Sequence, residues 1–398
     1  MKKNLTIIII TLTVISTFLL LTYFFISKSE KFTTITQNIN QNLFPAQIIK
    51  NNPDQIKNSL DNSPKNESAS DDLKLENPLK VISSEPVIDF DYKNQATTSL
   101  LVFVDRKGHV FEYNLNSEQD ATPTKISQTT IYQPQKADFL LGLDKNLVVV
   151  RSTDGRSSLI PLYQTKDILS QRLINNFQKS KSLDSNLIIT TQKDSSYIGF
   201  YKLNNKDFLS QELLYKTPFQ SWITEVVGDD VITFTTKPDE RLKGLSYWFN
   251  LKTKSLEKTL GPIAGLVTNV SPDKKYILYS NNKGDLNIYN KESRSTKTLT
   301  LKSIASKCLW ANDSSQIFCA APAKITTNLN YLNNWLKGQN ITHDNLWLID
   351  RESGKTYLMV DGLKYMFDIT NLKLSPDENV LSFINKNNSS LWILRFVP

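Results

Sequence analysis

The pattern of hydrophobic and polar positions divides the chain into three parts. The first is one apolar run: after Lys2 and Lys3, residues 4–27 carry no charge and are rich in Ile, Leu and Phe. The second, residues 28–78, is polar and shows neither a helical nor a strand period. Beyond residue 79, short runs alternate apolar and polar positions with a period of two, which is typical of β-strands.

The apolar run is long enough to cross a bilayer. From Leu5 to Ile26 a helix would extend about 33 Å, and the hydrocarbon core is about 30 Å thick. The run is longer than the apolar region of a secretory signal peptide and lacks a cleavage site of small residues. We expect residues 1–27 to be an uncleaved transmembrane signal anchor, with a cleaved signal peptide as the alternative. The charge balance favours a cytoplasmic N-terminus and an extracytoplasmic remainder.

Residues 28–78 are rich in Asn, Gln, Ser, Lys and Asp, and predict a disordered linker. The strands that follow are repeated. In six repeats an aspartate in a turn precedes a strand of Val, Ile, Leu or Phe, at Asp144, Asp184, Asp229, Asp273, Asp313 and Asp377. A first repeat, from Ser99, lacks this aspartate. Four strands per 40–45 residues is about the period of a propeller blade. Residues 79–398 are therefore predicted to be an all-β, seven-bladed β-propeller of four-stranded antiparallel blades.

The two ends of the predicted propeller complement each other. The last repeat ends after its third strand, and a spare strand, Leu79–Ser83, precedes the first repeat. Pairing it with Leu391–Phe396 would complete the seventh blade and remove an open edge. The rival fold, a parallel doubly wound sheet, needs crossover helices that the sequence lacks.

The turns are interpreted as structural. In Ser271-Pro272-Asp273 and Ser375-Pro376-Asp377, proline fixes φ and aspartate bonds the backbone that follows. One such turn per blade spreads the carboxylates around the molecule, which argues against a shared metal or catalytic site.

With the strands that follow them, these turns resemble the TolB-type, WD-like propeller repeat of bacterial envelope proteins, clearly over residues 265–398 and faintly over 86–260. The resemblance implies a membrane-anchored extracytoplasmic propeller that binds proteins or envelope polymers. Glycine is common after Pro-Asp in such repeats; here Lys274, Ser314 and Glu378 replace it or its counterpart.

Composition limits the classes of partner and of catalytic site that the chain can have. The net charge of +8 is spread over the chain with no basic stripe of interleaved aromatics, so no nucleic-acid partner is predicted; an anionic lipid or polymer is an alternative to simple solubility. Only two histidines occur, His109 and His343, in different repeats, and no nucleophile elbow, Walker loop or dinucleotide motif is present. We predict no enzyme, cofactor or metal. The alternatives to a binding scaffold are a structural subunit of an envelope complex or appendage, and a propeller lyase or hydrolase.

The only cysteines, Cys308 and Cys319, lie symmetrically about the turn at Asp313-Ser314. A two-residue turn places them opposite each other on adjacent strands, so a disulfide is predicted. A three-residue turn would separate them, and two buried free thiols are the alternative.

The sixth repeat is about 20 residues too long, between Lys324 and Asp344. Leu329, Leu332, Trp335 and Leu336 have helical spacing, and Gly338 follows as a cap. In one interpretation this helix packs over the propeller rim. In the other it presents Tyr331 or Trp335 to a partner, and the candidate partner-binding residues are Tyr331, Trp335, Leu336 and His343.

Overall fold

A computed structural model describes residues 79–396, except for 95–98, 118–120, 128–129, 132, 142–145, 154–156, 163–176, 180–187, 194–196, 204–210 and 325–330. One compact unit spans Leu79–Leu394; the other, Met1–Pro78 with Arg395–Pro398, lies almost entirely outside the described residues. The predicted anchor and linker therefore lie outside them too. In the part that is described, no helix has the length and apolarity to span a bilayer.

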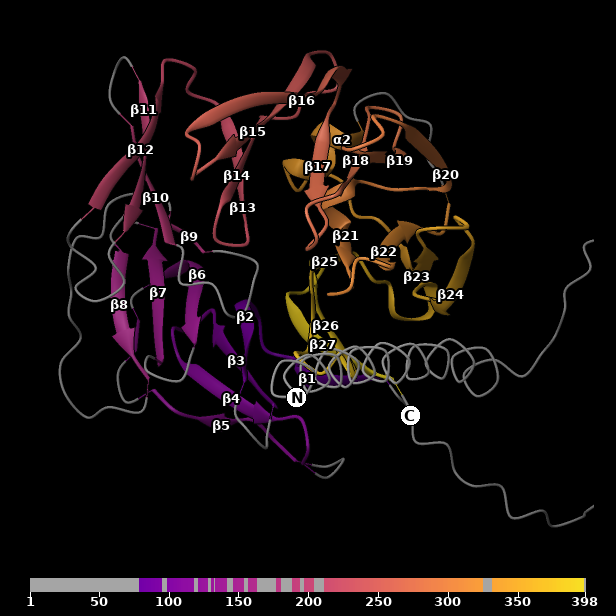
Figure 1. Cartoon of the computed structure of the whole chain (residues 1–398). Coiled ribbons are helices and arrows are strands. Elements are labelled where there is room, and N and C mark those ends of the chain that lie inside the picture. The colour runs from indigo at the N-terminus through magenta and orange to yellow at the C-terminus, as the bar shows by residue number, and fades with distance from the viewer. Residues whose placement is uncertain are drawn as a thin grey trace, which may run out of the picture. The chain divides into compact units, whose positions relative to one another are not determined.

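The described residues are nearly all β and form antiparallel sheets in chain order: six of four strands and one of three (Figure 1). The first three sheets comprise β2 (Val87–Asn94), β3 (Ser99–Asp105), β4 (Val110–Asn114) and β5 (Thr124–Lys125); β6 (Pro134–Leu141), β7 (Asn146–Ser152) and β8 (Ser157–Pro161); and β9 (Phe177–Lys179), β10 (Ile188–Lys193), β11 (Ile198–Leu203) and β12 (Gln211–Thr217).

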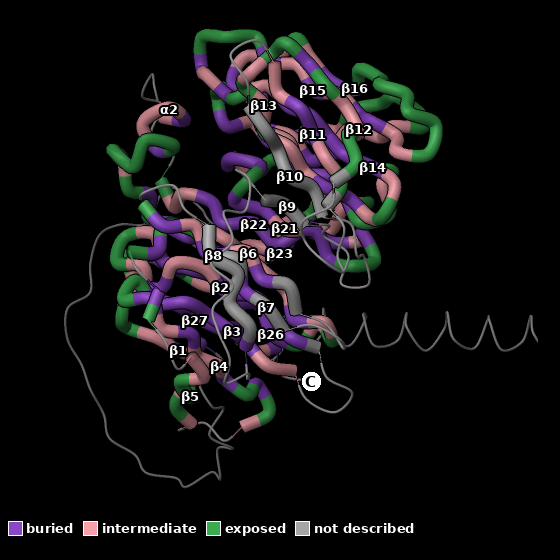
Figure 2. Tube along the Cα trace, turned by 90° about the vertical axis from the view of Figure 1, so that its left-hand side faces the viewer, coloured by how far each residue is buried: buried purple, intermediate pink, exposed green. Residues whose placement is uncertain are grey.

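The next three sheets comprise β13 (Trp222–Val227), β14 (Val231–Thr236), β15 (Lys243–Asn250) and β16 (Ser255–Ala264); β17 (Val267–Val270), β18 (Tyr276–Ser280), β19 (Asp285–Asn290) and β20 (Thr296–Lys302); and β21 (Cys308–Trp310), β22 (Gln316–Pro322), β23 (Asp344–Asp350) and β24 (Thr356–Val360). The last contains β25 (Ile369–Leu374), β26 (Val380–Asn385), β27 (Ser390–Arg395) and β1 (Leu79–Ser83). Inner strands such as β14 and β26 are largely buried, whereas outer strands such as β16 and many of the loops are exposed (Figure 2).

The last sheet joins the two ends of the described chain, as predicted. Strand β1 pairs antiparallel with β27, with Leu79 opposite Leu394 and Val81 opposite Trp392. Leu79 and Ile82 are buried, and Ile82 packs in a core shared with β2, β3 and β26. The first residues of the described chain thus supply the fourth strand that the last repeat lacks.

The first strands of successive sheets contact one another from β2 through β6, β9, β13, β17 and β21 to β25. Lys373 on β25 completes this series, because its ammonium lies 3.6 Å from Asp91 Oδ1 and 3.7 Å from Asp89 Oδ1 on β2. Burial lowers the pKa of Lys373, but the carboxylates of Asp91, Asp89 and Asp138 outweigh burial and hold the pKa above its usual range. The ammonium therefore stays charged, and the ionic cluster ties the last sheet to the first.

The residues that replace glycine in the turns have a structural role. Lys274, Ser314 and Glu378 all have positive φ, between 59° and 65°, which costs an L-residue of order 1 kcal/mol. Each one bonds the turn of the preceding sheet. Lys274 Nζ donates to Asp230, Ser314 Oγ accepts from Asp273 N at 3.1 Å, and Glu378 Oε1 accepts from Asn312 N at 2.7 Å. A glycine could adopt the turn but could not make these links.

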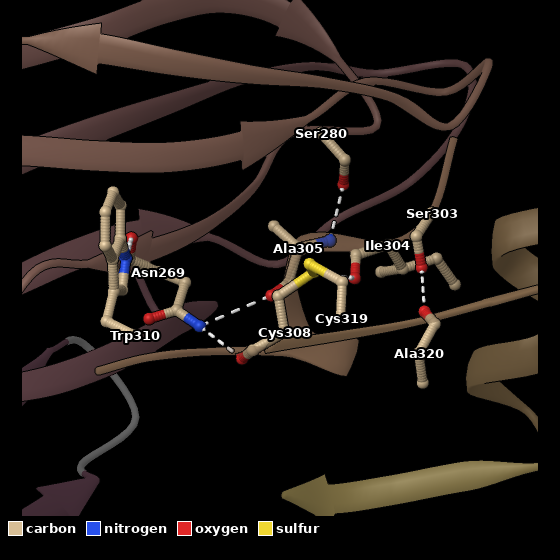
Figure 3. The surroundings of a disulfide bond; sticks show 9 residues. All are labelled: Asn269, Ser280, Ser303, Ile304, Ala305, Cys308, Trp310, Cys319 and Ala320. Atoms are coloured by element: carbon tan, nitrogen blue, oxygen red, sulfur yellow. Dashed lines mark hydrogen bonds between the residues drawn. A yellow bond between two sulfur atoms is a disulfide. The ribbon is translucent and has the colours of Figure 1, made fainter. Parts of the chain in front are cut away.

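The predicted disulfide is present. Cys308 on β21 and Cys319 on β22 are direct partners in the antiparallel register, and their sulfur atoms are bonded (Figure 3). The amide of Asn269, on β17, donates to the carbonyl of Cys308 at 2.6 Å and so holds β21 against the neighbouring sheet. The bond is buried.

Removing β1 should destabilise the protein. Residues 76–398 should unfold cooperatively, and residues 86–398 should lose about 3 kcal/mol or more, because Leu79 and Ile82 each contribute about 1.5–3 kcal/mol by burial. Urea unfolding of both chains measures the difference. Val81→Ala, on the exposed side of β1, is the control for Ile82→Ala. Equal free energies for the two chains would refute closure by β1.

The disulfide should be detectable by mass. Alkylation without reductant should add no label, and alkylation after reduction under denaturing conditions should add two. Because the bond closes a short loop, the double substitution Cys308→Ala and Cys319→Ala should cost less than about 3 kcal/mol in unfolding free energy. Two labels on the unreduced chain would contradict the bond.

Candidate functional site

The strand order places two kinds of connection at opposite ends of each sheet. Connections between the second and third strands lie at the same end as the segments that join one sheet to the next. We call this end the α2 face, because it carries helix α2 (Tyr331–Leu336), which lies between β22 and β23. The opposite end, with the links at Asp230, Asp273 and Asn312, is the turn face.

Helix α2 is docked on its face at both ends. At its start, Glu240 Oε1 from the β14–β15 loop accepts hydrogen bonds from the backbone N–H groups of Leu332 and Asn333, at 2.5 and 3.3 Å. The side chains of Leu332 and Trp335 are buried in a core with residues of β17–β23. So short a helix is marginal alone, and these contacts stabilise it.

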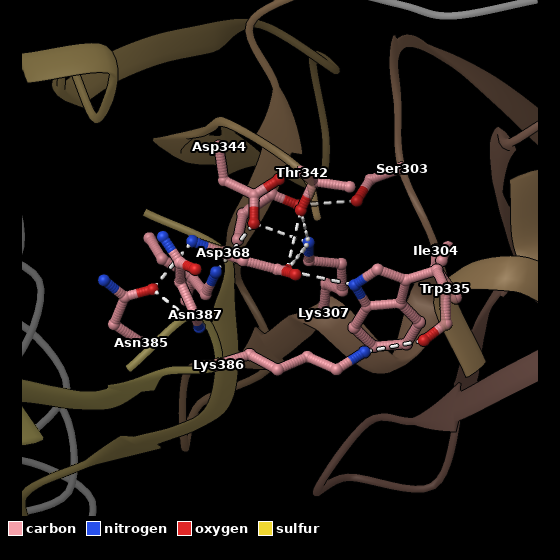
Figure 4. Close-up of polar contacts among 12 residues, drawn as sticks. Ser303, Ile304, Lys307, Trp335, Thr342, Asp344, Asp368, Asn385, Lys386 and Asn387 are labelled. Carbon is pink, nitrogen blue, oxygen red and sulfur yellow. Dashed lines mark hydrogen bonds and ion pairs between the residues drawn. The ribbon is translucent and has the colours of Figure 1, made fainter. Parts of the chain in front are cut away.

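Beneath α2 lies a lysine with no exposed surface. Lys307, at the end of the short 3-10 helix η1 (Ala305–Lys307), places its ammonium 2.5 Å from Asp344 Oδ2 and 3.0 Å from Asp368 Oδ1, and donates to Thr342 Oγ1 at 2.6 Å (Figure 4). Trp335 Nε1 also donates to Asp368 Oδ1, at 3.0 Å. One ammonium thus links the η1, β23 and β25 segments to the helix.

Lys386, from the β26–β27 loop, completes this cluster. Its ammonium donates to the Trp335 carbonyl at 2.6 Å and lies 4.0 Å from the centre of the indole ring. Burial, with the like charge of Lys307, lowers the pKa of Lys386. We call Lys307, Trp335, Thr342, Asp344, Asp368 and Lys386 the Lys307 cluster.

The two carboxyl groups of the cluster differ. Burial raises the pKa of Asp344 above its usual range, although the Lys307 ammonium opposes the shift. Burial acts the same way on Asp368, but Lys307 and the hydrogen bonds from Trp335 and Thr342 outweigh it, so the pKa of Asp368 is lowered. In the described residues at and beside the cluster, Asp344 Oδ1, Asp368 Oδ2 and the hydroxyl of Tyr331 are buried without a hydrogen-bond partner. The ion pairs of Lys307 hold the segments beneath the helix, although these three polar atoms have no hydrogen-bond partner.

The α2 face is also where large apolar side chains are exposed. Their exposed fractions in the loops around α2 are 66% for Leu242, 44% for Leu336, 55% for Ile341, 47% for Leu363 and 54% for Met366. We call these five residues the α2 patch. Its members are close in sequence to residues that bond α2 or belong to the Lys307 cluster. Leu242 lies two residues after Glu240, Leu336 follows Trp335, and Ile341 precedes Thr342. In the described loops of the turn face, none of the large apolar side chains is exposed in this way.

The structure places the four predicted partner-binding residues in different environments. Trp335 is buried, Tyr331 is half-buried, and Leu336 and His343 are exposed. Trp335 contacts the Lys307 cluster, whereas Leu336 belongs to the patch. The burial of Trp335 agrees with the first interpretation, in which the helix packs against the propeller. Binding by these residues stays a prediction.

Sequence reasoning missed Lys307, Asp344 and Asp368. They lie in three separate segments, and no motif or spacing relates them. No group of histidine, cysteine and acidic side chains in the described part of the chain is arranged to hold a metal ion.

Removing the buried ammonium should be costly. Lys307→Met leaves two buried carboxylates without their cation, and we expect a loss of about 3–5 kcal/mol in unfolding free energy. Urea unfolding followed by tryptophan fluorescence measures it. Lys386→Met, at a partly exposed site, is the control and should cost less. Adding Asp344→Asn and Asp368→Asn to Lys307→Met should restore part of the loss; a fully additive loss would contradict the ion-pair interpretation.

Comparison with known proteins identifies the fold. No family model and no curated protein matches the chain. Among solved structures, a chain of the mitotic checkpoint complex matches with a TM-score of 0.50 at 10% identity, over 85% of this chain and 99% of that one. The oligogalacturonate lyase from Vibrio parahaemolyticus matches with a TM-score of 0.52 at 11% identity, over 80% and 93%. Both are β-propellers, and at these identities the likeness shows the β-propeller fold alone.

Proposed function

We propose that the chain is a membrane-tethered, extracytoplasmic β-propeller of the TolB-like type that acts as a scaffold for a protein or an envelope polymer. Residues 1–27 are its transmembrane anchor, 28–78 its linker and 79–398 a seven-bladed propeller closed by β1. No catalytic role is assigned to it. The fourfold strand repeat, the contacts between successive first strands and the Lys373 link from β25 to β2 support the closed propeller.

The observation that carries the scaffold function is the contrast between the two faces of one fold. The α2 face exposes Leu242, Ile341 and other apolar side chains, and exposed apolar patches on soluble domains mark interaction sites. The turn face is polar in its described loops and is held by hydrogen bonds between successive turns. A molecule with two chemically different, internally linked faces is suited to hold two components of the envelope in a fixed relation.

The disulfide supports the extracytoplasmic placement. Both cysteines of the chain are joined, and such bonds persist in oxidising compartments and are rare in the cytosol. The apolar run at the N-terminus supports the tether.

The proposal predicts a membrane-held protein with a specific neighbour. The full chain should stay in the membrane pellet after alkaline carbonate extraction, and deletion of residues 1–27 should release it. A photo-crosslinking side chain at Glu292, on the turn face, should give a discrete protein adduct or a polymer ladder in cells. The same group at Leu213, on the outer strand β12, is the control.

Release of the full chain by carbonate would contradict the tether. Crosslinking at Glu292 no stronger or more discrete than at Leu213 would contradict a partner on the turn face.

A further inference from the structure

We infer that the α2 face docks on an anionic lipid bilayer. The inference rests on the proposed function and adds a partner to it: the α2 patch enters the headgroup region, and the turn face is left for the protein or polymer. The docked surface consists of the α2 patch and the lysines around it.

The composition of the patch favours lipid over a protein partner. Its exposed members are Leu, Ile and Met, and exposed lysines surround them, whereas lysine is depleted in protein interfaces. Phe219, in the β12–β13 connection of the same face, is the exposed aromatic side chain there. The large aromatic side chain of the helix, Trp335, is buried in the Lys307 cluster and is not offered to a partner. Leucine and phenylalanine side chains beside lysines are typical of surfaces that insert shallowly into a bilayer.

The charges around the patch complement anionic headgroups. Lys243, Lys283, Lys337 and Lys364 are exposed in the same loops, and none of their ammonium groups forms an ion pair with a described residue. Long lysine side chains can lie along an apolar surface and still reach phosphate oxygens. The acidic side chains in the loops of Leu242 and Leu363 have partners: Asp239 is paired with Arg241, Glu240 accepts from the start of α2, and Asp361 accepts a hydrogen bond from Leu363 N.

The Lys307 cluster holds the docked surface rigid. Leu336 and Ile341 flank residues that bond Asp368, and Met366 lies two residues before it, so the Lys307 cluster fixes the segments that carry these side chains. Little ordering is then needed on contact, which favours binding.

The linker does not decide which face meets the membrane. Residues 28–78 extend to at most about 170 Å, far more than the thickness of a sheet-built domain. Either face can therefore reach the bilayer, and surface chemistry selects the α2 face.

Lipid quenching tests the inference on the full chain. Leu363→Cys on the α2 face and Glu292→Cys on the turn face are each labelled with the fluorophore NBD, and the chain is reconstituted in nanodiscs that carry spin-labelled lipid. With phosphatidylglycerol present, NBD at position 363 should be quenched and NBD at position 292 should not. With phosphatidylcholine alone, or at high salt, quenching at position 363 should fall.

Charge removal supplies a matched pair. Replacing Lys243, Lys337 and Lys364 by Gln should lower the ratio of docked to undocked protein about 100-fold, because each lysine near an anionic surface contributes about fivefold. Replacing Lys252, Lys275 and Lys355 by Gln removes the same charge from the turn face and should leave quenching unchanged. All six lysines replaced in the two variants are exposed, so an unchanged thermal transition should accompany each variant.

Equal, weak quenching at positions 363 and 292 in anionic nanodiscs overturns the inference. So does a label at position 363 that is shielded only when a protein partner is present, an outcome that leaves the scaffold function standing. A chain that fails to enter nanodiscs contradicts the tether alone. The labelled chain is then added to preformed phosphatidylglycerol vesicles, where the contrast between the two labels is again required.

Discussion

The last sheet takes its fourth strand from the other end of the described chain, because β1 pairs with β27. Much else depends on this pairing. It brings β25, β26 and β27 against the sheet that begins with β2, where Lys373 meets Asp89 and Asp91. It also places Ile82 in the core shared by the first and last sheets. Without the closing strand the last sheet would keep three strands, and this core would lose Ile82.

The links between turns spread this closure to the opposite end of the sheets. These links are made by Lys274, Ser314 and Glu378, which have an unfavourable positive φ. The side chain of each forms a hydrogen bond with the turn of the preceding sheet. Adjacent sheets are thus held by polar contacts at the turn face as well as by side chains packed between them. A surface held in this way keeps its shape when it binds, so it loses little conformational entropy.

On the α2 face, the feature that needs stabilisation is the short helix α2. The long β22–β23 connection of this face carries helix α2, and a six-residue helix has too few internal hydrogen bonds to persist alone. The Lys307 ammonium helps to hold the helix in place, since it pairs with Asp344 and with Asp368, and Asp368 also accepts a hydrogen bond from the Trp335 indole. Burying these charges is expensive, and such clusters position segments more than they stabilise the fold. The result is a fixed apolar and basic surface beside a polar one.

The strand repeat, the closing strand and the disulfide were all predictable from the sequence, because each depends on local spacing. Alternation with a period of two sets the strands, the short turn at Asp313-Ser314 brings Cys308 opposite Cys319, and a missing fourth strand identifies its partner. The position of the helix in the extra length of the sixth repeat was also predictable. For Trp335 the sequence left two alternatives, packing against the propeller or exposure to a partner. Only the tertiary structure decided that Trp335 is buried, because its partners Lys307, Asp368 and Lys386 come from three other segments that no periodicity relates. The same reason explains why most of the α2 patch could not be found in the sequence: Leu242, Leu363 and Met366 are ordinary apolar residues, and only the folding of distant loops onto one face leaves them exposed there with Leu336.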